Sequence, residues 1–266
     1  MSIIHESSGS VSAPDALGLT RRGHIGAMMS GFLLYALLGE ARAAPPSRRL
    51  SPGRWVDRQQ ELAQALASGQ LRPVNWCTEV ERLAAEVDVG ELMAVVGRSR
   101  LNAGGVGGTN DPQKRSVVFL DDANAPRRLN YATALFAFQP HNVITPHGHQ
   151  NMVSAHMVVE GRLRIRNFDR VRDEAGSMVV RPTRDHLAAL GEVSTMCSQR
   201  NNIHWFVPQG GPATTFDVII SGLDRHAPPY TIEAIDPLGG RRLSDGLIAA
   251  PIIGFDEASQ KYTSAL

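Results

Sequence analysis

The chain has 266 residues, of which 42% are hydrophobic and 20% charged, and 27 basic side chains nearly balance 26 acidic ones. A formal charge of +1 on this globular composition argues against a nucleic-acid binder or a polybasic membrane-surface protein. The 25 glycines and 16 prolines follow no repeat, so they indicate many turns and a β-rich domain rather than a helical bundle.

Residues 1–43 have the three parts of an export signal. Arg21 and Arg22 precede an uncharged, largely apolar stretch at residues 25–38, and Ala41-Arg42-Ala43 resembles a cleavage site. The stretch is shorter than the about 20 residues that a helix needs to cross a bilayer, so a stable membrane anchor is the weaker interpretation. The paired arginines favour a cleavable twin-arginine-type signal over an ordinary secretory one. They predict transient contact with the twin-arginine export machinery and a periplasmic or secreted bacterial protein.

Residues 44–110 are predicted to form a helical segment in front of the β-rich domain. Apolar residues recur at helical spacing over residues 55–70 and 78–96, so we expect two amphipathic helices. Residues 102–111 are rich in glycine, but no Gly-Lys-Ser/Thr and no helical pattern follow them. We interpret this stretch as a loop rather than a phosphate-binding site.

Residues 111–266 are predicted to form a β-barrel with a C-terminal extension. Short strand-like runs separated by turn residues favour an antiparallel sandwich or barrel. In the second run, Ala134, Phe136 and Phe138 are expected to be inaccessible as a group, in preference to the residues between them. The expected strands cover residues 116–120, 131–138, 152–159, 163–168, 178–181, 203–207 and 214–220.

Histidines carry most of the chemical information in this domain. Two of the nine lie in the export signal, and the others all lie between His141 and His226. Residues two apart on a β-strand project to the same face, so His147 and His149 can direct two imidazoles at one metal ion while a distant strand supplies a third. Neutral imidazole suits iron, copper, zinc and nickel. The alternative is a pair of solvated histidines on a strand or loop.

The histidine motifs resemble those of the cupins. Pro146-His147-Gly148-His149, followed by Gly161, resembles the first cupin motif, and Asn202-Ile203-His204 before a Pro and Gly turn resembles the second. Within the cupins, residues 129–222 are most similar to the thiol dioxygenases of the cysteamine dioxygenase and plant cysteine oxidase group. The shared positions are His147, His149, Met152, Gly161, Ile165, Phe168, Asp169, Asn202, His204 and Asp217.

This resemblance implies a fold, a metal and a reaction. The fold is a mainly β, cupin-type double-stranded β-helix (jelly-roll barrel) with an N-terminal pair of helices. His147, His149 and His204 would bind Fe(II), and Asp217 would be a catalytic residue that orients the site. The implied activity is the oxidation of a small thiol by O2 to a sulfinic acid.

The chain departs from common cupin patterns at two places. Many cupins have a Glu ligand five residues after the second histidine, where this chain has Ser154. Thiol dioxygenases share this loss, which leaves a coordination position for a substrate thiolate. The group also has a Pro-Pro-Tyr element whose tyrosine falls at Leu223 of this chain. Pro228-Pro229-Tyr230 either replaces that element after an insertion or is a coincidence.

The sequence leaves the role of His156 open between a fourth ligand, a partner of the ligands and a core histidine. His156 lies about 6 to 7 Å along the strand from Ser154, which favours the last two. Two other functions also stay open. One is a cupin metalloenzyme with other chemistry, such as oxidation or isomerisation of a small carbon substrate, and the other is a cupin that binds a small ligand without turnover. Cys77 and Cys197 could form a disulfide in an oxidising compartment, but the sequence does not require one, and both could equally be buried free thiols.

Overall fold

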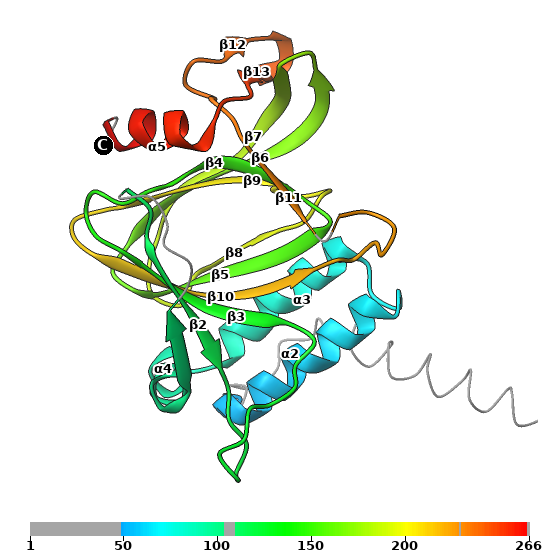
Figure 1. Cartoon of the computed structure of the whole chain (residues 1–266), viewed down its shortest axis with the longest axis vertical. Coiled ribbons are helices and arrows are strands. Elements are labelled where there is room, and N and C mark those ends of the chain that lie inside the picture. Colours follow the sequence, from blue (N-terminus) through cyan, green and yellow to red (C-terminus); the bar gives the residue numbers. More distant parts are fainter. Residues whose placement is uncertain (1–48, 104–109, 229, 265–266) are drawn as a thin grey trace, which may run out of the picture. The chain divides into compact units, whose positions relative to one another are not determined.

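Two antiparallel sheets dominate the computed structural model of the chain, which describes residues 49–103, 110–228 and 230–264 (Figure 1). These residues belong to one compact unit, Arg48–Leu266. The helices are α2 Pro52–Ala67, α3 Pro73–Glu86, α4 Val89–Arg98, the short 3₁₀ helix η1 Ser244–Gly246 and α5 Phe255–Ser264. The strands are β1 Arg100–Ala103, β2 Gln113–Val118, β3 Ala132–Phe138, β4 Ile144–Gln150, β5 Met152–Glu160, β6 Leu163–Glu174, β7 Ser177–Ala188, β8 Val193–Met196, β9 Ile203–Pro208, β10 Ala213–Ser221, β11 Thr231–Ala234, β12 Arg241–Arg242 and β13 Ile248–Pro251.

The order of the strands identifies the architecture. The first sheet has the order β1-β2-β3-β10-β5-β8 and the second has the order β11-β4-β9-β6-β7-β13-β12. Between β3 and β10 the chain therefore passes from one sheet to the other at every step except the β6–β7 hairpin, which stays within the second sheet. This is the arrangement of an eight-stranded, double-sheet jelly roll, extended at its edges by further strands. The mainly β jelly-roll fold expected from the sequence is confirmed.

The helical segment differs from the expected pair of helices. The region expected to be one helix over residues 78–96 contains the end of α3 and all but the last two residues of α4. Val87 is extended between them, and the Asp88 carboxylate accepts a hydrogen bond of 3.0 Å from the backbone N–H of Glu91. Asp88 thus caps a new helix, which a pattern of apolar residues alone does not reveal.

Helices α2 and α3 cover the outer face of the first sheet (Figure 1). Trp55 and Trp76 of the helices share a buried cluster with Phe216 of β10, and the rings of Trp55 and Phe216 lie 5.9 Å apart. The first sheet is therefore covered on both faces. The alternation expected in β3 holds only in part: Ala134 and Phe138 are buried, but Phe136 is only partly buried and Thr133 of the opposite set is buried.

Inside the barrel, an apolar cluster closes the space between the sheets. It consists of Phe138, Val158, Leu163, Ile165, Ala188, Phe206 and Ala213. Gly161 makes the tight turn between β5 and β6 at a φ of +68°, where an added Cβ would lie 2.2 Å from the Pro212 carbonyl oxygen. Glycine is therefore required at this position of the first cupin-like motif.

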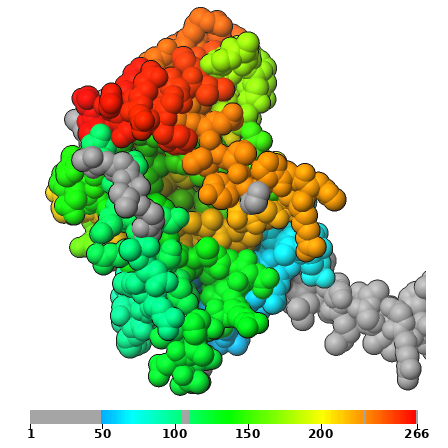
Figure 2. All heavy atoms as spheres, in the orientation of Figure 1, coloured from blue at the N-terminus to red at the C-terminus, as the bar shows by residue number. Residues whose placement is uncertain are grey.

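Helix α5 packs on the outside of the second sheet, and Figure 2 shows it in red on the opposite side of the strands from the blue-to-cyan helices. The Tyr262 ring meets the Trp205 ring of β9 at 4.8 Å, and the Tyr262 hydroxyl donates a 2.8 Å hydrogen bond to Asp236. On the same ring of Trp205, the Arg166 guanidinium lies 3.9 Å from the centroid. Strand β9 is thus held firmly from outside the barrel.

Two predicted segments lie outside the described residues: the export signal at residues 1–43, and residues 104–109 of the Gly-rich loop. Strand β1, which precedes that loop, pairs with β2 in the first sheet. Among the helices that the structure describes, none combines the length and the apolar character needed to span a membrane.

Candidate metal centre

Three histidines from two neighbouring strands meet inside the barrel. His147 and His149 project from β4, and His204 projects from β9, where it is the cross-strand partner of His147. One ring nitrogen from each side chain lies within 4.8 Å of the corresponding nitrogens of the other two. The Nε2 atoms of His149 and His204 are 3.4 Å apart. The structure brings together the three side chains that the sequence predicts as ligands.

Hydrogen bonds orient the first two imidazoles. His147 Nδ1 donates to the Thr145 carbonyl oxygen at 2.7 Å, which leaves the lone pair of Nε2 free. His149 Nδ1 lies 3.1 Å from the Met152 sulfur, while its Nε2 faces His204. The nitrogens that remain available therefore point toward one another.

Burial keeps these imidazoles uncharged at neutral pH. It lowers the pKa of His147 to about 4, against a smaller opposing effect of the hydrogen bond to Thr145. Burial also lowers the pKa values of His149 and His204 well below 6.5, and the neighbouring imidazoles add to the effect. A neutral imidazole has a lone pair to donate, so the cluster can bind a cation without first losing protons.

The donor set fits a divalent transition-metal ion. Two nitrogens in adjacent positions at about 2.0 to 2.1 Å from one ion lie about 3 Å apart, close to the separation of the His149 and His204 nitrogens. Within the described residues, the group contains three histidines and no carboxylate. Nitrogen donors of this kind suit iron, copper, zinc or nickel rather than calcium or magnesium.

Asp217 lies behind this cluster rather than within it. Its carboxylate accepts a 2.7 Å hydrogen bond from His156 Nδ1, and His156 Nε2 lies 2.8 Å from the Ser154 hydroxyl. Because both ring nitrogens of His156 have partners, His156 is not placed as a fourth ligand. Its ring instead meets that of His204 edge to face at 4.7 Å.

His156 belongs to a layer of polar residues across the barrel. On β10 and β8, its two cross-strand partners are Asp217 and Ser194. The Ser194 hydroxyl donates to the Asn167 side-chain oxygen at 3.3 Å, and Asn167 is the partner of His204 on β6. This buried polar layer adjoins both the candidate ligands and the apolar cluster, because the His156 ring lies 4.7 Å from that of His204 and 5.1 Å from that of Phe206. Sequence reasoning missed Ser194 and Asn167, because neither belongs to a motif.

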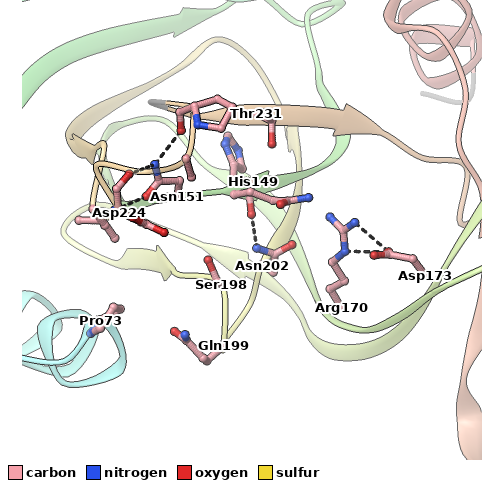
Figure 3. Close-up of a pocket in the computed structure, with 14 residues that line it drawn as sticks. Pro73, His149, Asn151, Arg170, Asp173, Ser198, Gln199, Asn202, Asp224 and Thr231 are labelled. Carbon is pink, nitrogen blue, oxygen red and sulfur yellow. Dashed lines mark hydrogen bonds and ion pairs between the residues drawn. The ribbon is translucent and has the colours of Figure 1, made fainter.

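A cavity of about 570 Å³ opens beside His149 (Figure 3). Asn202 supports this wall, since its side-chain N–H donates to the His149 carbonyl oxygen. The charged side chains at the cavity are Arg170, Asp173 and Asp224, and Arg170 is already paired with Asp173 at 2.8 Å. The lining residues are Pro73, His149, Gln150, Asn151, Arg170, Asp173, Ser198, Gln199, Asn202, Leu223, Asp224, Ala227, Pro228 and Thr231.

The segment that carries Pro228 and Tyr230 borders the same cavity only in part. Leu223 and Pro228 line it, and the β10–β11 segment that carries them, orange in Figure 2, reaches the helical segment containing Pro73. Tyr230 is 56% exposed and is not among the lining residues. The structure therefore does not bring this tyrosine to the histidines.

No family model matches the chain, and no curated protein matches its sequence at a significant level. Similar solved structures include a sugar phosphate isomerase from a cupin superfamily of Silicibacter pomeroyi, at 18% identity and a TM-score of 0.35, with 61% of this chain and 92% of that chain covered. An oxalate oxidase in complex with the substrate analogue glycolate is 19% identical, with a TM-score of 0.33 and coverage of 49% and 58%. Procruciferin, an 11S globulin from Brassica napus, is 11% identical, with a TM-score of 0.35 and coverage of 50% and 29%. The chain thus spans little more than half of the oxidase chain and less than a third of the globulin chain, and the fold assignment rests on the strand order.

Proposed function

We propose that the protein is an Fe(II)-dependent thiol dioxygenase that oxidises a small thiol to a sulfinic acid. The observation that supports this proposal most is the group of three histidines without a carboxylate, together with Ser154 at the sequence position where many cupins have a Glu ligand. In the proposed reaction, R–SH and O2 combine to give R–SO2H, so that both oxygen atoms enter the product. Bound iron would supply coordination positions for the thiolate and O2 and the electron transfer between them.

The chain's own residues hold and enclose this centre. Thr145 fixes the tautomer of His147, and burial keeps all three imidazoles neutral. The ring of Phe206, at 4.8 Å from that of His204, helps to exclude water from the closed side of the barrel. The cavity beside His149 provides the open side, and its volume is in the range of small-molecule sites.

The cavity also favours one class of thiol. Asp173 and Asp224 contribute two negative charges against the single positive charge of Arg170. Such a lining attracts a neutral or amine-bearing thiol and disfavours one that carries a carboxylate. The proposed substrate is therefore a small thiol without net negative charge.

Anaerobic reconstitution with Fe(II) tests the proposal. Oxygen uptake would be measured with cysteamine, cysteine, 3-mercaptopropionate and a peptide that begins with cysteine, and the sulfinate would be identified by mass. The variant His204→Ala should lose iron and oxygen uptake together, because two imidazoles hold the ion weakly. The matched control is His141→Ala, which replaces an exposed histidine outside the cluster.

The other two candidate functions predict different results. Protein that binds iron but consumes oxygen with none of the thiols would be a cupin-like metalloenzyme of other chemistry. Protein that binds a small ligand but no metal would be a non-catalytic binding protein. Either result overturns the dioxygenase proposal.

We further propose that the protein is exported through the twin-arginine route and works in the periplasm or outside the cell. The proposal rests on Arg21 and Arg22 ahead of the apolar stretch at residues 25–38. Folded export would allow iron to be inserted in the cytoplasm, before copper or zinc compete for nitrogen ligands. Replacing both arginines with lysine should block translocation, and normal export of that variant would exclude this route.

A further inference from the structure

The two cysteines of the chain lie in one buried cluster although they are far apart in the sequence. Cys77 is on α3 and Cys197 directly follows β8, and both are free thiols with 0% of their surface exposed. They belong to the same buried cluster, and Glu81, one helical turn after Cys77, bonds at 2.6 Å to both Thr195 and Arg200, which lie on either side of Cys197 in the sequence. Two buried thiols between a helix and a strand end that already pack together need little movement to form a bond.

The surroundings make Cys197 the more reactive of the two. Cys197 and Arg200 form a tight turn with reciprocal backbone hydrogen bonds of 2.9 and 3.3 Å. The hydrogen bond from Cys77, together with backbone N–H groups of Gln199 and Arg200, lowers the pKa of Cys197 to about 7. The same thiol contact and burial raise the pKa of Cys77. Of the two thiols, Cys197 is therefore the one that loses its proton more readily.

We propose that Cys77 and Cys197 form a redox-active pair whose disulfide links α3 to the turn between β8 and β9. The oxidant class is a small-molecule disulfide, such as oxidised glutathione. Both thiols are buried in the folded protein, so the exchange takes place during folding, before α3 packs on the turn after β8: the Cys197 thiolate attacks one glutathione sulfur and releases the other as a thiolate. Cys77 then loses its proton and attacks the Cys197 sulfur, which releases the second glutathione. Two protein thiols are oxidised, and one glutathione disulfide is reduced to two thiols.

The disulfide would fix one wall of the cavity beside His149. Pro73, one helical turn before Cys77, lines that cavity, as do Ser198 and Gln199 in the turn after Cys197 (Figure 3). These two wall segments are already joined by the ion pair of 2.6 Å between Arg200 and Glu81. A covalent bond beside that ion pair would prevent the wall from opening. The pair is a separate device from the metal centre and does not depend on the proposed reaction.

The test uses the full chain in its metal-free form. The protein is unfolded, refolded in a buffer of reduced and oxidised glutathione, and digested without reduction for mass spectrometry. We expect one linked pair of peptides that contains Cys77 and Cys197 and lacks two hydrogen atoms. The oxidised protein should melt about 5 to 10 °C above the reduced protein, since the bond closes a long loop. Hydrogen exchange should slow at residues 197–200 and at the start of α3.

Control variants and further measurements distinguish the formation of the disulfide from its effect on the cavity wall. Cys77→Ala and Cys77→Ser should show no linked peptide and no redox-dependent change in melting temperature. If iodoacetamide labels both cysteines of the refolded, oxidised wild-type protein after denaturation, the proposed pairing is wrong. If the linked peptide forms but exchange at residues 197–200 is unchanged, the bond does not fix the cavity wall.

Discussion

His156 donates a 2.7 Å hydrogen bond to Asp217, its direct cross-strand partner in the first sheet. Both side chains are buried, and the His156 ring packs on that of His204, so His156 links the Asp217 carboxylate to a candidate metal ligand. The sequence resemblance implies a catalytic role for this aspartate. The geometry instead favours a positioning role, in which Asp217 fixes a side chain that supports a ligand.

A double-mutant cycle measures this relationship. Asp217→Ala should lower the free energy of unfolding by about 1 to 3 kcal/mol, because it leaves the buried His156 N–H without an acceptor. Combined with His156→Phe, the loss should be smaller than the sum of the two single losses. Urea denaturation of the metal-free proteins provides the measurement, with Asp122→Ala at an exposed position as the control. Additive losses would show that the two side chains do not interact.

Introducing a carboxylate at Ser154 should separate metal binding from thiol oxidation. Ser154→Glu restores the ligand type of many cupins at a buried position on β5, so it should retain iron but lose thiol-stimulated oxygen uptake. Ser154→Ala should retain both, and Ser154→Asp provides a smaller carboxylate if the Glu variant does not fold. Iron content and oxygen uptake are measured on the same samples. Full uptake by an iron-loaded, folded Glu variant would contradict the proposed open position.

The buried imidazoles predict acid sensitivity of the metal-free fold. His147 titrates near 6.5 in the unfolded chain but at about 4 in the folded protein, so between these values the unfolded state binds more protons. The free energy of unfolding should therefore fall as the pH drops from about 7 to about 4, by at most about 3 kcal/mol from this residue. Carboxylates titrate in the same window, so the measurement is a comparison of urea curves with those of His147→Gln. An identical pH dependence in the variant would contradict the prediction.

The charges at the cavity predict a substrate preference. At low ionic strength, cysteamine should be used about 3- to 10-fold more efficiently than 3-mercaptopropionate, as measured by kcat/KM for oxygen uptake. Asp224→Asn should reduce that preference, and so should added salt, because Asp224 lies at the solvent-exposed rim. Asp122→Asn, away from the cavity lining, is the matched control. A stronger preference for the anionic thiol would show that Arg170 dominates recognition.

Much of the barrel could be predicted because its strands are short runs of branched and aromatic residues bounded by turns. Strand β4 was not among those runs, since its residues include Pro146 and Gly148 and show no apolar alternation. It is a strand because β9 and β11 pair with it on both sides. The C-terminal helix α5 was missed too, because it buries only Ala258 and Tyr262 and has a weak apolar pattern.

The three histidines could be predicted from spacing because two lie on one strand and a motif marks the third. The role of His156 could not. That role depends on the strand register that places Asp217 opposite His156, and on the contact between the two sheets that brings the rings of His156 and His204 together. Both are properties of the folded barrel. The contact between Cys77 and Cys197 is hidden in the sequence for the same reason.

Trp205 follows His204 in β9, and consecutive residues of a strand project to opposite faces. The face opposite the candidate ligand is the one clamped between Arg166 and Tyr262. A substitution at Tyr262 can therefore act on His204 through the single peptide unit that links it to Trp205, without entering the barrel. The packing on the outer surface of β9 and the position of the candidate ligand on its inner face therefore depend on each other.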